Sequence, residues 1–397
     1  MGADPVSGPG PARPNRSEAD GPAPAAVEPP SAPDTPPAPT ARLSGLTRTE
    51  KALMAAVAVA TVLAGVTRYA HGVSRVIAFV VATLALAGLA WIVALATEEV
   101  GQRLGTATTG LLQSTVGNLP EFFVVIFALQ AGDRVVAETA ILGSILVNAL
   151  LVLGLVIVAG ALRERKRDGI MRFNPRLPND TATLLLVSSF IIVLIGLTHG
   201  AGDPASRHSK TISIIGAVVI LAVYATWLRQ YLTTPESATH VRGQPRLRLA
   251  TSIVLLVLAG TASAFVSDWF INALEPTIET LHISKAFAGL VIVAIAGNAV
   301  EHAAGVVLAA KGQADLAISV VKNSVAQIAA FLYPLLVLVS LLTATTLTFS
   351  LAPVYIGALI GTAVIVWQIT GDGEATVFEG TALVATFVIL ATVAAFE

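Results

Sequence analysis

Cysteine is absent from the 397-residue chain, and charged residues make up only 12% of it. The absence of thiols excludes disulfides, iron–sulfur clusters and thiolate metal sites. Because a soluble domain is about 25% charged, this chain has too few charges to cover a surface that faces water. Its net charge of −1 at pH 7 argues against nucleic acid as a partner. Hydrophobic residues make up 55% of the chain, so the sequence predicts that the lipid bilayer covers much of its surface.

Proline is concentrated near one end of the chain. Of the 21 prolines, 12 lie between Pro5 and Pro39, among alanine, serine, glycine and acidic residues. Such a segment cannot bury enough apolar surface to offset the entropy of ordering it. It also lacks the basic start and the apolar core of a signal peptide. We therefore predict that residues 1–45 form a disordered cytoplasmic tail.

Long apolar runs occupy most of the remaining sequence. A helix needs roughly 20 apolar residues to cross the hydrocarbon core, and about eleven runs meet this requirement. They lie near residues 50–69, 74–100, 107–130, 135–160, 181–199, 211–232, 249–274, 286–310, 315–342, 347–369 and 376–396. The predicted fold class is an all-α polytopic membrane protein.

Basic residues indicate the orientation of these spans, because cytoplasmic loops carry an excess of Lys and Arg. With a cytoplasmic N-terminus, the cytoplasmic side collects Arg42, Arg48, Lys51, Arg103, the cluster from Arg163 to Arg176, Arg229, Arg242, Arg246, Arg248 and Lys311. The opposite side holds the smaller set Arg68, Arg75, Arg134, Arg207, Lys210 and Lys285. We predict a bacterial-type plasma membrane protein with its N-terminus inside and its C-terminus outside.

An internal repeat divides the chain. The segment 117–121 (Gly-Asn-Leu-Pro-Glu) recurs as 297–301 (Gly-Asn-Ala-Val-Glu), and the offset of 180 residues holds as far as Ser144 and Ser324. The copies lie in the third and eighth spans, so they enter the membrane from opposite sides, which is a common plan of secondary transporters. The predicted organisation is a first membrane helix over 46–72, five-helix repeats over 73–232 and 248–397, and a basic cytoplasmic loop over 233–247.

Each repeat carries a carboxylate within an apolar stretch. Charge at the centre of a bilayer costs at least a few kcal/mol, so such residues indicate function. Glu121 and Glu301 each follow an asparagine, Asn118 or Asn298, by three positions, which places both side chains on one helix face. Two carboxylates and two amide oxygens suit Ca²⁺, which takes roughly six to eight oxygen ligands. We predict that these four residues bind the cation, with the two glutamates as the metal ligands.

Neighbouring residues extend this prediction. Glycines at 117 and 297 permit close backbone approach, and Pro120 is expected to remove a helical hydrogen bond and so free carbonyl ligands. A supporting polar shell is predicted from side chains at matching depth in the next spans and from the histidine beside the second glutamate: Ser144, Asn148, Ser324, Gln327 and His302. Interhelical hydrogen bonding is an equally good explanation for the two serines.

Proton coupling follows from the same carboxylates. Two glutamates that share a site of low dielectric constant cannot both stay ionised, so protons and Ca²⁺ compete for one charge requirement. Glu98 and Asp268 each lie near the end of the span before a repeat motif, and we predict that they belong to the proton pathway. A position at the membrane interface is the simpler alternative for Glu98.

At these residues the sequence resembles the cation/proton exchanger (CAX) branch of the calcium/cation antiporter superfamily. The resemblance covers most of residues 75–397. It rests on Ala96-Thr97-Glu98, the two Gly-Asn motifs, Gly143 to Asn148, Ser267-Asp268, Gln327-Ile328-Ala329 and Asp372-Gly373-Glu374. It implies eleven helices arranged as one plus two inverted five-helix repeats. It further implies exchange of Ca²⁺ for protons, with Glu121 and Glu301 as central ligands.

The sequence departs from this branch at a few positions. Leu119 and Pro120 replace a small residue and threonine, and a proline before the glutamate is more typical of sodium/calcium exchangers. Asp268 replaces the usual glutamate. Lys322 and Asn323 stand where the family has an aliphatic or small residue and glycine. We expect Lys322 to extend its ammonium to the membrane interface, because long basic side chains do so at little cost.

The sequence therefore predicts a secondary antiporter that exports Ca²⁺, or a similar divalent cation, against protons. Ca²⁺ is its transported substrate, and no cofactor is expected. A Na⁺/Ca²⁺ or monovalent cation/H⁺ exchanger with the same fold is the alternative. An intramembrane metalloenzyme is disfavoured, because the sequence has no His-Glu-x-x-His motif.

Overall fold

The computed structural model describes residues 2, 45–103, 116–233 and 245–397, without the side chains of 176–178, 231–233, 300 and 301. Residues Leu43–Glu397 form one compact unit. Nearly all of the predicted tail, most of the predicted basic loop and the start of the third predicted span lie outside the described residues. The predicted domain boundaries therefore stay predictions.

Helices account for nearly all of the described first half of the chain. Its elements are α1 (Arg48–Tyr69), α2 (Arg75–Gly101), α4 (Leu119–Gln130), α5 (Arg134–Leu146), the π-helical segment η1 (Val147–Val152), α6 (Leu153–Arg163), the 3₁₀ turn η2 (Glu164–Lys166), the strand β1 (Ile170–Arg172), α7 (Arg176–Gly200), the 3₁₀ turn η3 (Pro204–His208) and α8 (Ser209–Thr233).

The second half repeats much of this order. Its elements are α9 (Leu249–Leu281), the short α10 (Lys285–Phe287), the π-helical segment η5 (Ala288–Val293), α11 (Ala294–Ala310), α12 (Ala314–Gln327), the π-helical segment η6 (Ile328–Leu332), α13 (Tyr333–Val339), the 3₁₀ turn η7 (Ser340–Leu342), α14 (Pro353–Thr370), the strand β2 (Glu374–Thr376) and α15 (Val377–Ala395).

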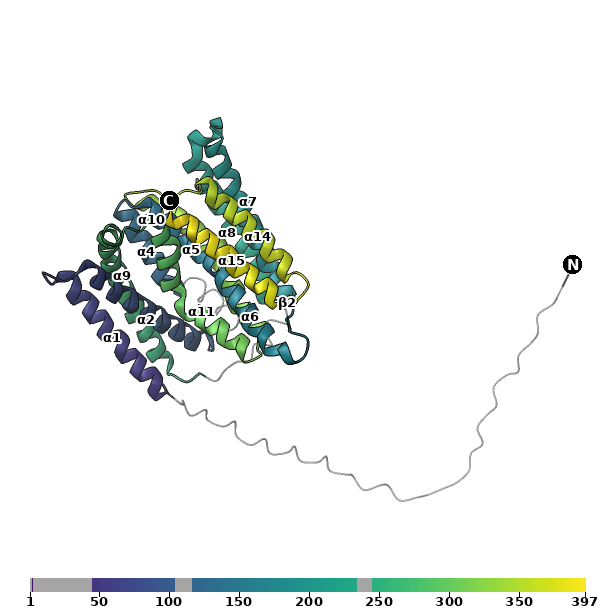
Figure 1. Cartoon of the computed structure of the whole chain (residues 1–397), viewed down its shortest axis with the longest axis horizontal. Helices are drawn as coiled ribbons and strands as arrows, with labels where there is room; N and C mark the ends of the chain where they lie inside the picture. Colours follow the sequence, from purple (N-terminus) through teal and green to yellow (C-terminus); the bar gives the residue numbers. More distant parts are fainter. Residues whose placement is uncertain (1, 3–44, 104–115, 234–244) are drawn as a thin grey trace, which may run out of the picture. The chain divides into compact units, whose positions relative to one another are not determined.

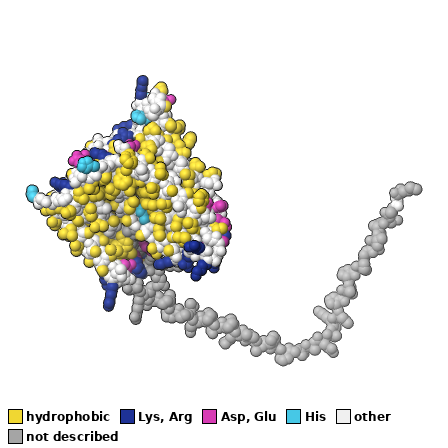
Figure 2. Space-filling view, in the orientation of Figure 1, with side chains coloured by type: hydrophobic (Ala, Val, Ile, Leu, Met, Phe, Trp, Pro, Cys, Tyr) yellow, Lys and Arg dark blue, Asp and Glu magenta, His cyan; other side chains and the backbone are white. Residues whose placement is uncertain are grey.

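The composition of these helices fits a membrane. Among the described residues, nine helices are long and apolar enough to span a bilayer, or ten if the bent pair over Lys285–Ala310 is one span. Helix α4 is shorter but also apolar. Hydrophobic side chains cover most of the face shown in Figure 2, and charged side chains gather at its edges. The predicted polytopic helical fold is confirmed, whereas the count of eleven spans is not.

The internal repeat is visible in the structure. The turns before α5 and α12 each contain a glycine with positive φ, 82° at Gly132 and 81° at Gly312. Both helices then pass into π-helical segments, η1 and η6. A side chain at either glycine would be strained, because L-residues rarely adopt this backbone conformation. The same local geometry therefore recurs at the offset of 180 residues.

The first long helices of the two repeats run in opposite directions. Leu247, just before α9, donates its backbone N–H to Glu99 near the end of α2. Farther along α9, the ring of Phe270 lies 5.0 Å from that of Phe79 near the start of α2. Helix α1 packs against both, and the three lie side by side in Figure 1. This antiparallel pairing is the geometry that an inverted repeat requires.

Glycines bring several helices into backbone contact. A Cβ on Gly143 in α5 would lie 2.3 Å from the carbonyl oxygen of Leu290 in η5. Gly154 in α6 and Gly380 in α15 face each other in the same way, 2.6 Å from Cβ position to carbonyl oxygen. Membrane helices associate through such close packing, because lipid gives them no hydrophobic driving force. These contacts fix α5 against the segment that leads into α11.

A small sheet joins the two repeats. Strand β1 pairs antiparallel with β2, with Met171 opposite Ala375. Arg172 bonds Asp168 and Glu374 at 2.7 and 3.0 Å, and these contacts raise the pKa of Arg172 and lower that of Asp168. The hydrogen bond from Arg172 is the main cause of the shift at Asp168. These strands were not predicted from the sequence. Their presence means that the fold is not purely helical.

Candidate cation site

The first motif lies at the start of α4. Asn118 precedes the helix and is buried, and its side chain does not cap it. Pro120 lies in the first turn, where a backbone N–H has no helical acceptor in any case. The helix is interrupted at residues 117–118, just before Pro120, so the expected effect of Pro120 on a continuous helix stays a prediction. Glu121 follows in the same turn and is buried.

The second motif lies at a bend. The helical segments Lys285–Ala299 and His302–Ala310 make an angle of 63°, and the bend falls within the motif that ends at Glu301. Sharp bends interrupt the regular ladder of helical hydrogen bonds, and broken helices of transporters offer the released carbonyls to ions. The bend agrees with the expectation of a broken helix at one of the two motifs.

The two motifs meet at Gly297. A Cβ at this position would lie 2.7 Å from Oε1 of Glu121 and 3.1 Å from its Cδ. Only glycine leaves room for the carboxylate there. Beside it, the side-chain amide of Asn298 donates to Oγ of Ser144 over 3.3 Å, which joins α11 to α5. Residues of both repeats that the sequence singled out therefore lie together in the buried interior.

Among the described residues, two buried oxygen acceptors at this level have no hydrogen-bond donor. The amide nitrogen of Asn148 donates to the backbone oxygen of Ser144 over 2.8 Å, which leaves its Oδ1 buried without a partner. Oγ of Ser324 is likewise buried and unpartnered. An unpaired buried polar atom costs about 1–3 kcal/mol, so it normally has a partner such as a water or an ion. Carboxylate, amide and hydroxyl oxygens are the ligands that a hard cation takes.

Three predicted residues are less well placed. The side chain of Glu301 lies outside the described residues, so its approach to Glu121 stays a prediction. Gln327 is half-buried at the end of α12. His302 is half-buried, and its Nε2 has no hydrogen-bond partner among the described side chains. Among the described side chains, no three His, Cys, Asp or Glu residues converge on one point.

The two acids of the predicted proton pathway lie at opposite ends of the α2–α9 pair. Glu98 is exposed near the end of α2, where Gln102 donates to it over 3.3 Å. Asp268 is half-buried and accepts a hydrogen bond of 3.2 Å from Asn272. Their role in proton movement stays a prediction.

Glu99, the neighbour of Glu98, has a structural role that the sequence did not indicate. Its side chain is 1% exposed and accepts three hydrogen bonds, from the backbone of Arg246 and Leu247 and from the guanidinium of Arg246. Arg246 also donates to Glu50 in α1 over 2.8 Å. Its hydrogen bonds to Glu50 and then Glu99 raise the pKa of the Arg246 guanidinium. The cluster ties the start of α1 and the end of α2 to the segment before α9.

Lys322 does not reach an interface. The residue is 1% exposed, and within the part of the chain that the structure describes its Nζ has no hydrogen-bond partner. It lies in the interior of α12, two residues before Ser324. The expectation that Lys322 extends to the membrane interface is therefore wrong, because α12 is enclosed by α6, α7 and α11 at this level.

Glu138 in α5, like Glu99, was not singled out from the sequence. Its side chain is 16% exposed. It lies within a predicted span, so the rule that intramembrane carboxylates indicate function would have found it. It has no motif and no counterpart in the second repeat, where Ile318 stands.

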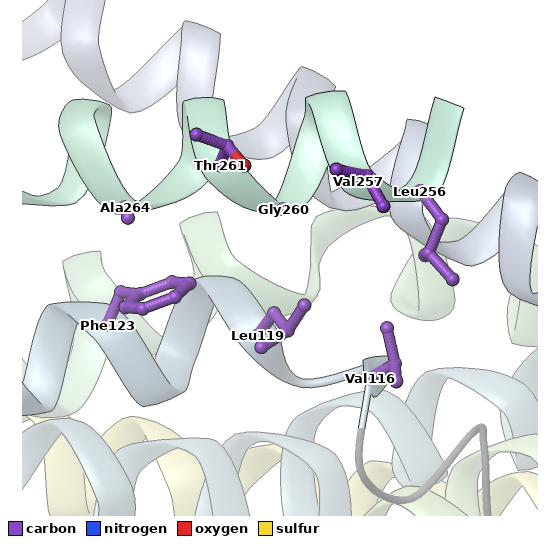
Figure 3. Close-up of a pocket in the computed structure, with 8 residues that line it drawn as sticks. All are labelled: Val116, Leu119, Phe123, Leu256, Val257, Gly260, Thr261 and Ala264. Atoms are coloured by element: carbon purple, nitrogen blue, oxygen red, sulfur yellow. The ribbon is translucent and has the colours of Figure 1, made fainter. Parts of the chain in front are cut away.

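A groove lies on the other face of α4. Leu119 and Phe123 face Gly260 and Ala264 of α9 across it, and it encloses about 460 Å³ (Figure 3). Its lining is apolar except for Thr261. Among the described residues that line the groove, none carries a charge, and the candidate site is the buried region where Glu121 meets Gly297.

Comparison with known proteins identifies relatives that match most of the chain. The profile of the family described as sodium/calcium exchanger protein matches residues 74–229 and 251–396. The chain is 32% identical over 340 residues to a Ca²⁺/H⁺ antiporter of Synechocystis, covering 79% of this chain and 89% of that protein. It is 30% identical over 322 residues to a vacuolar calcium ion transporter of Schizosaccharomyces pombe, covering 79% and 77%.

Solved structures show the same fold. The structure of native YfkE superposes with a TM-score of 0.72 and 26% identity, covering 87% of this chain and 99% of that one. The H⁺/Ca²⁺ exchanger CAX superposes with a TM-score of 0.66 over 86% of this chain and 88% of that one. At 17% identity, the second likeness speaks for the fold alone.

Proposed function

Because the chain belongs to the sodium/calcium exchanger protein family, we propose that it is a secondary active antiporter that exchanges Ca²⁺ for protons. Relatives named as calcium transporters and Ca²⁺/H⁺ antiporters support the choice of ions. The observation that carries the proposal is the buried carboxylate of Glu121 against Gly297 of the opposite repeat, beside the Asn298–Ser144 contact.

The proposed binding set joins both repeats. Glu121 and Glu301 supply the charge, Asn118 and Asn298 supply amide oxygens, and Ser144, Asn148, Ser324 and Gln327 complete the shell directly or through water. The unpartnered oxygens of Asn148 and Ser324 support this assignment. Ca²⁺ accepts such a set because its coordination is flexible in number and angle.

Proton exchange follows from the charge of this set. With Ca²⁺ bound, two carboxylates balance the ion in a region that excludes water. Without it, two adjacent negative charges repel at low dielectric constant, so protonation relieves the cost. We take the carrier to reorient only when the charge of the site is neutralised. It then carries Ca²⁺ in one direction and the protons that replace it in the other. Glu98 and Asp268, at opposite ends of the α2–α9 pair, are proposed to pass protons toward each side.

The proposed direction is export. With the N-terminus in the cytoplasm of a bacterial-type cell, a proton gradient directed inward drives Ca²⁺ outward. The excess of Lys and Arg on the loops assigned to the cytoplasm supports this orientation.

The test is a flux measurement in proteoliposomes. Vesicles with an acidic interior and an internal pH dye receive CaCl₂, MnCl₂ or NaCl in turn, and Ca²⁺ is expected to dissipate the pH gradient. Glu121→Gln and Glu301→Gln are expected to abolish this exchange in folded protein, whereas the matched control Glu164→Gln, at an exposed ion pair with Arg167, keeps it. Full proton-coupled Ca²⁺ flux in either site variant would overturn the assignment. Ca²⁺ uptake driven by a Na⁺ gradient at clamped pH would favour the Na⁺/Ca²⁺ alternative.

A further inference from the structure

Glu138 is a carboxylate in the membrane-spanning part of α5 that the binding set above does not use. Arg134, one turn earlier, holds one of its oxygens, with 2.6 Å between Nε of Arg134 and Oε1 of Glu138. The Glu138 side chain is 16% exposed and that of Arg134 is 40% exposed, so the pair leads from the surface toward the interior.

Arg134 connects Glu138 to further polar groups. Arg134 also donates to Oγ1 of Thr348 over 2.7 Å, and the hydroxyl of the fully buried Tyr333 donates to the backbone oxygen of Thr348 over 3.2 Å. Glu138 lies within electrostatic range of the hydroxyls of Tyr333 and Tyr355. The hydroxyl of Tyr355 in turn donates to the exposed Glu397.

Charged groups at the outer end of α5 continue this cluster to the surface. Asp133 caps α5 and bonds Nζ of Lys285 in α10 at 2.8 Å. Lys285 also bonds Glu275 of α9 at 3.0 Å. Among the described residues, Arg134, Tyr333 and Tyr355 are the titratable or charged ones that interact with Glu138, and the Asp133–Lys285–Glu275 chain lies at the same end of α5. The charged and polar side chains at the start of α5 form one cluster in an otherwise apolar surface, and we call this cluster the polar mouth.

The inner end of α5 leads to the candidate cation site. Ser144, which accepts from Asn298, lies six residues beyond Glu138. At 1.5 Å per residue this is a rise of about 9 Å along α5, with Ser144 turned about 120° around the helix axis from Glu138. The corresponding residue of α12 is Ile318, so the second repeat offers no such carboxylate.

We propose that Glu138 carries protons between the polar mouth at the start of α5 and the carboxylates of the cation site. A proton enters from the side of Glu397, binds a carboxylate oxygen of Glu138, and leaves through water to Glu121 or Glu301 when Ca²⁺ departs. Loss of the proton leaves Glu138 ionised, and the pair with Arg134 stabilises that form. This inference rests on the proposed exchange of Ca²⁺ for protons, and it gives the outer half of the pathway a side chain of its own.

The test uses the full-length protein with Glu138→Gln, which keeps the size and hydrogen bonding of the side chain but binds no proton. Equilibrium Ca²⁺ binding to the purified variant is expected to match the wild type. Ca²⁺-driven proton flux in proteoliposomes is expected to fall at least about tenfold, and its dependence on pH at the C-terminal side is expected to flatten. Glu138→Asp is expected to restore part of the flux.

The matched control is Glu374→Gln, which makes the same change in an arginine-paired carboxylate on β2. It is expected to leave flux and pH profile unchanged. If the wild type exchanges Ca²⁺ for protons and Glu138→Gln does so with the same rate and pH profile, Glu138 is only a structural ion partner and the proposal fails. If the wild type itself moves no protons with Ca²⁺, the proposed function fails and this inference fails with it.

Discussion

Substitution of Gly297 by alanine tests the contact between the repeats directly. The new methyl group would lie 2.7 Å from Oε1 of Glu121 and 3.1 Å from its Cγ and Cδ, closer than real Cβ atoms approach such neighbours. Either the carboxylate or the bent helix α11 must move. Overpacking of this size costs about 1–3 kcal/mol. If the displaced Glu121 carboxylate is a ligand of Ca²⁺, the same cost appears in binding, and the affinity for Ca²⁺ falls about 5- to 150-fold.

Calorimetric titration of purified protein with Ca²⁺ measures this loss, and thermal unfolding in detergent shows whether the variant still folds. The matched control is Gly361→Ala in α14, where a Cβ would meet nothing within 4 Å. This control is expected to keep the wild-type Ca²⁺ affinity. Its helix should be no less stable than that of the wild type, because alanine is the better helix former by up to about 1 kcal/mol. Wild-type Ca²⁺ affinity in folded Gly297→Ala protein would show that Glu121 does not bind the ion at this contact.

Three further predictions concern stability. Arg246→Gln is expected to lower the melting temperature, because Glu99 loses its guanidinium partner, and the added change Glu99→Gln is expected to recover part of the loss; an unchanged melting temperature would contradict the clamp. Lys322→Met is expected to stabilise the protein by about 1–4 kcal/mol in denaturant unfolding, because it removes a buried ammonium that has no hydrogen-bond partner; a destabilised variant would mean that the ammonium has a favourable role. The pKa of Asp168 is lowered by Arg172, so this carboxylate stabilises the fold above its unfolded value of 3.8, and the contribution is lost as the pH falls through the lowered pKa; Asp168→Asn should flatten unfolding profiles only in that acidic range.

Periodic features of the fold were predictable from the sequence. Apolar runs gave the helices, and the offset of 180 residues gave the repeat, because the same turn glycines, Gly132 and Gly312, serve the same backbone geometry in each copy. The placement of Asn298 and Ser144 near each other also followed from the repeat. Patterns of this kind reflect local rules, which a single sequence carries in full.

Features that depend on partners distant in sequence were not predictable. The pairing of β1 with β2 joins residues about 200 positions apart, and neither segment is long enough to show strand periodicity. Glu98 and Glu99 are adjacent residues of the same type, so the sequence does not distinguish their roles. The contact with Arg246 in the folded structure shows that Glu99 has a structural role. Lys322 followed the general tendency of lysine to reach the interface, which the enclosure of α12 by its neighbours overrides.

Release of protons on Ca²⁺ binding tests the central claim most directly. Purified protein in weakly buffered solution near neutral pH is titrated with Ca²⁺ while a pH electrode records the protons set free. We expect the wild type to release protons as Ca²⁺ displaces them from Glu121 and Glu301, and we expect either Glu→Gln variant to lose both the release and most of the binding. Tight Ca²⁺ binding without proton release in the wild type, or unchanged release in either variant, would contradict the shared carboxylate site.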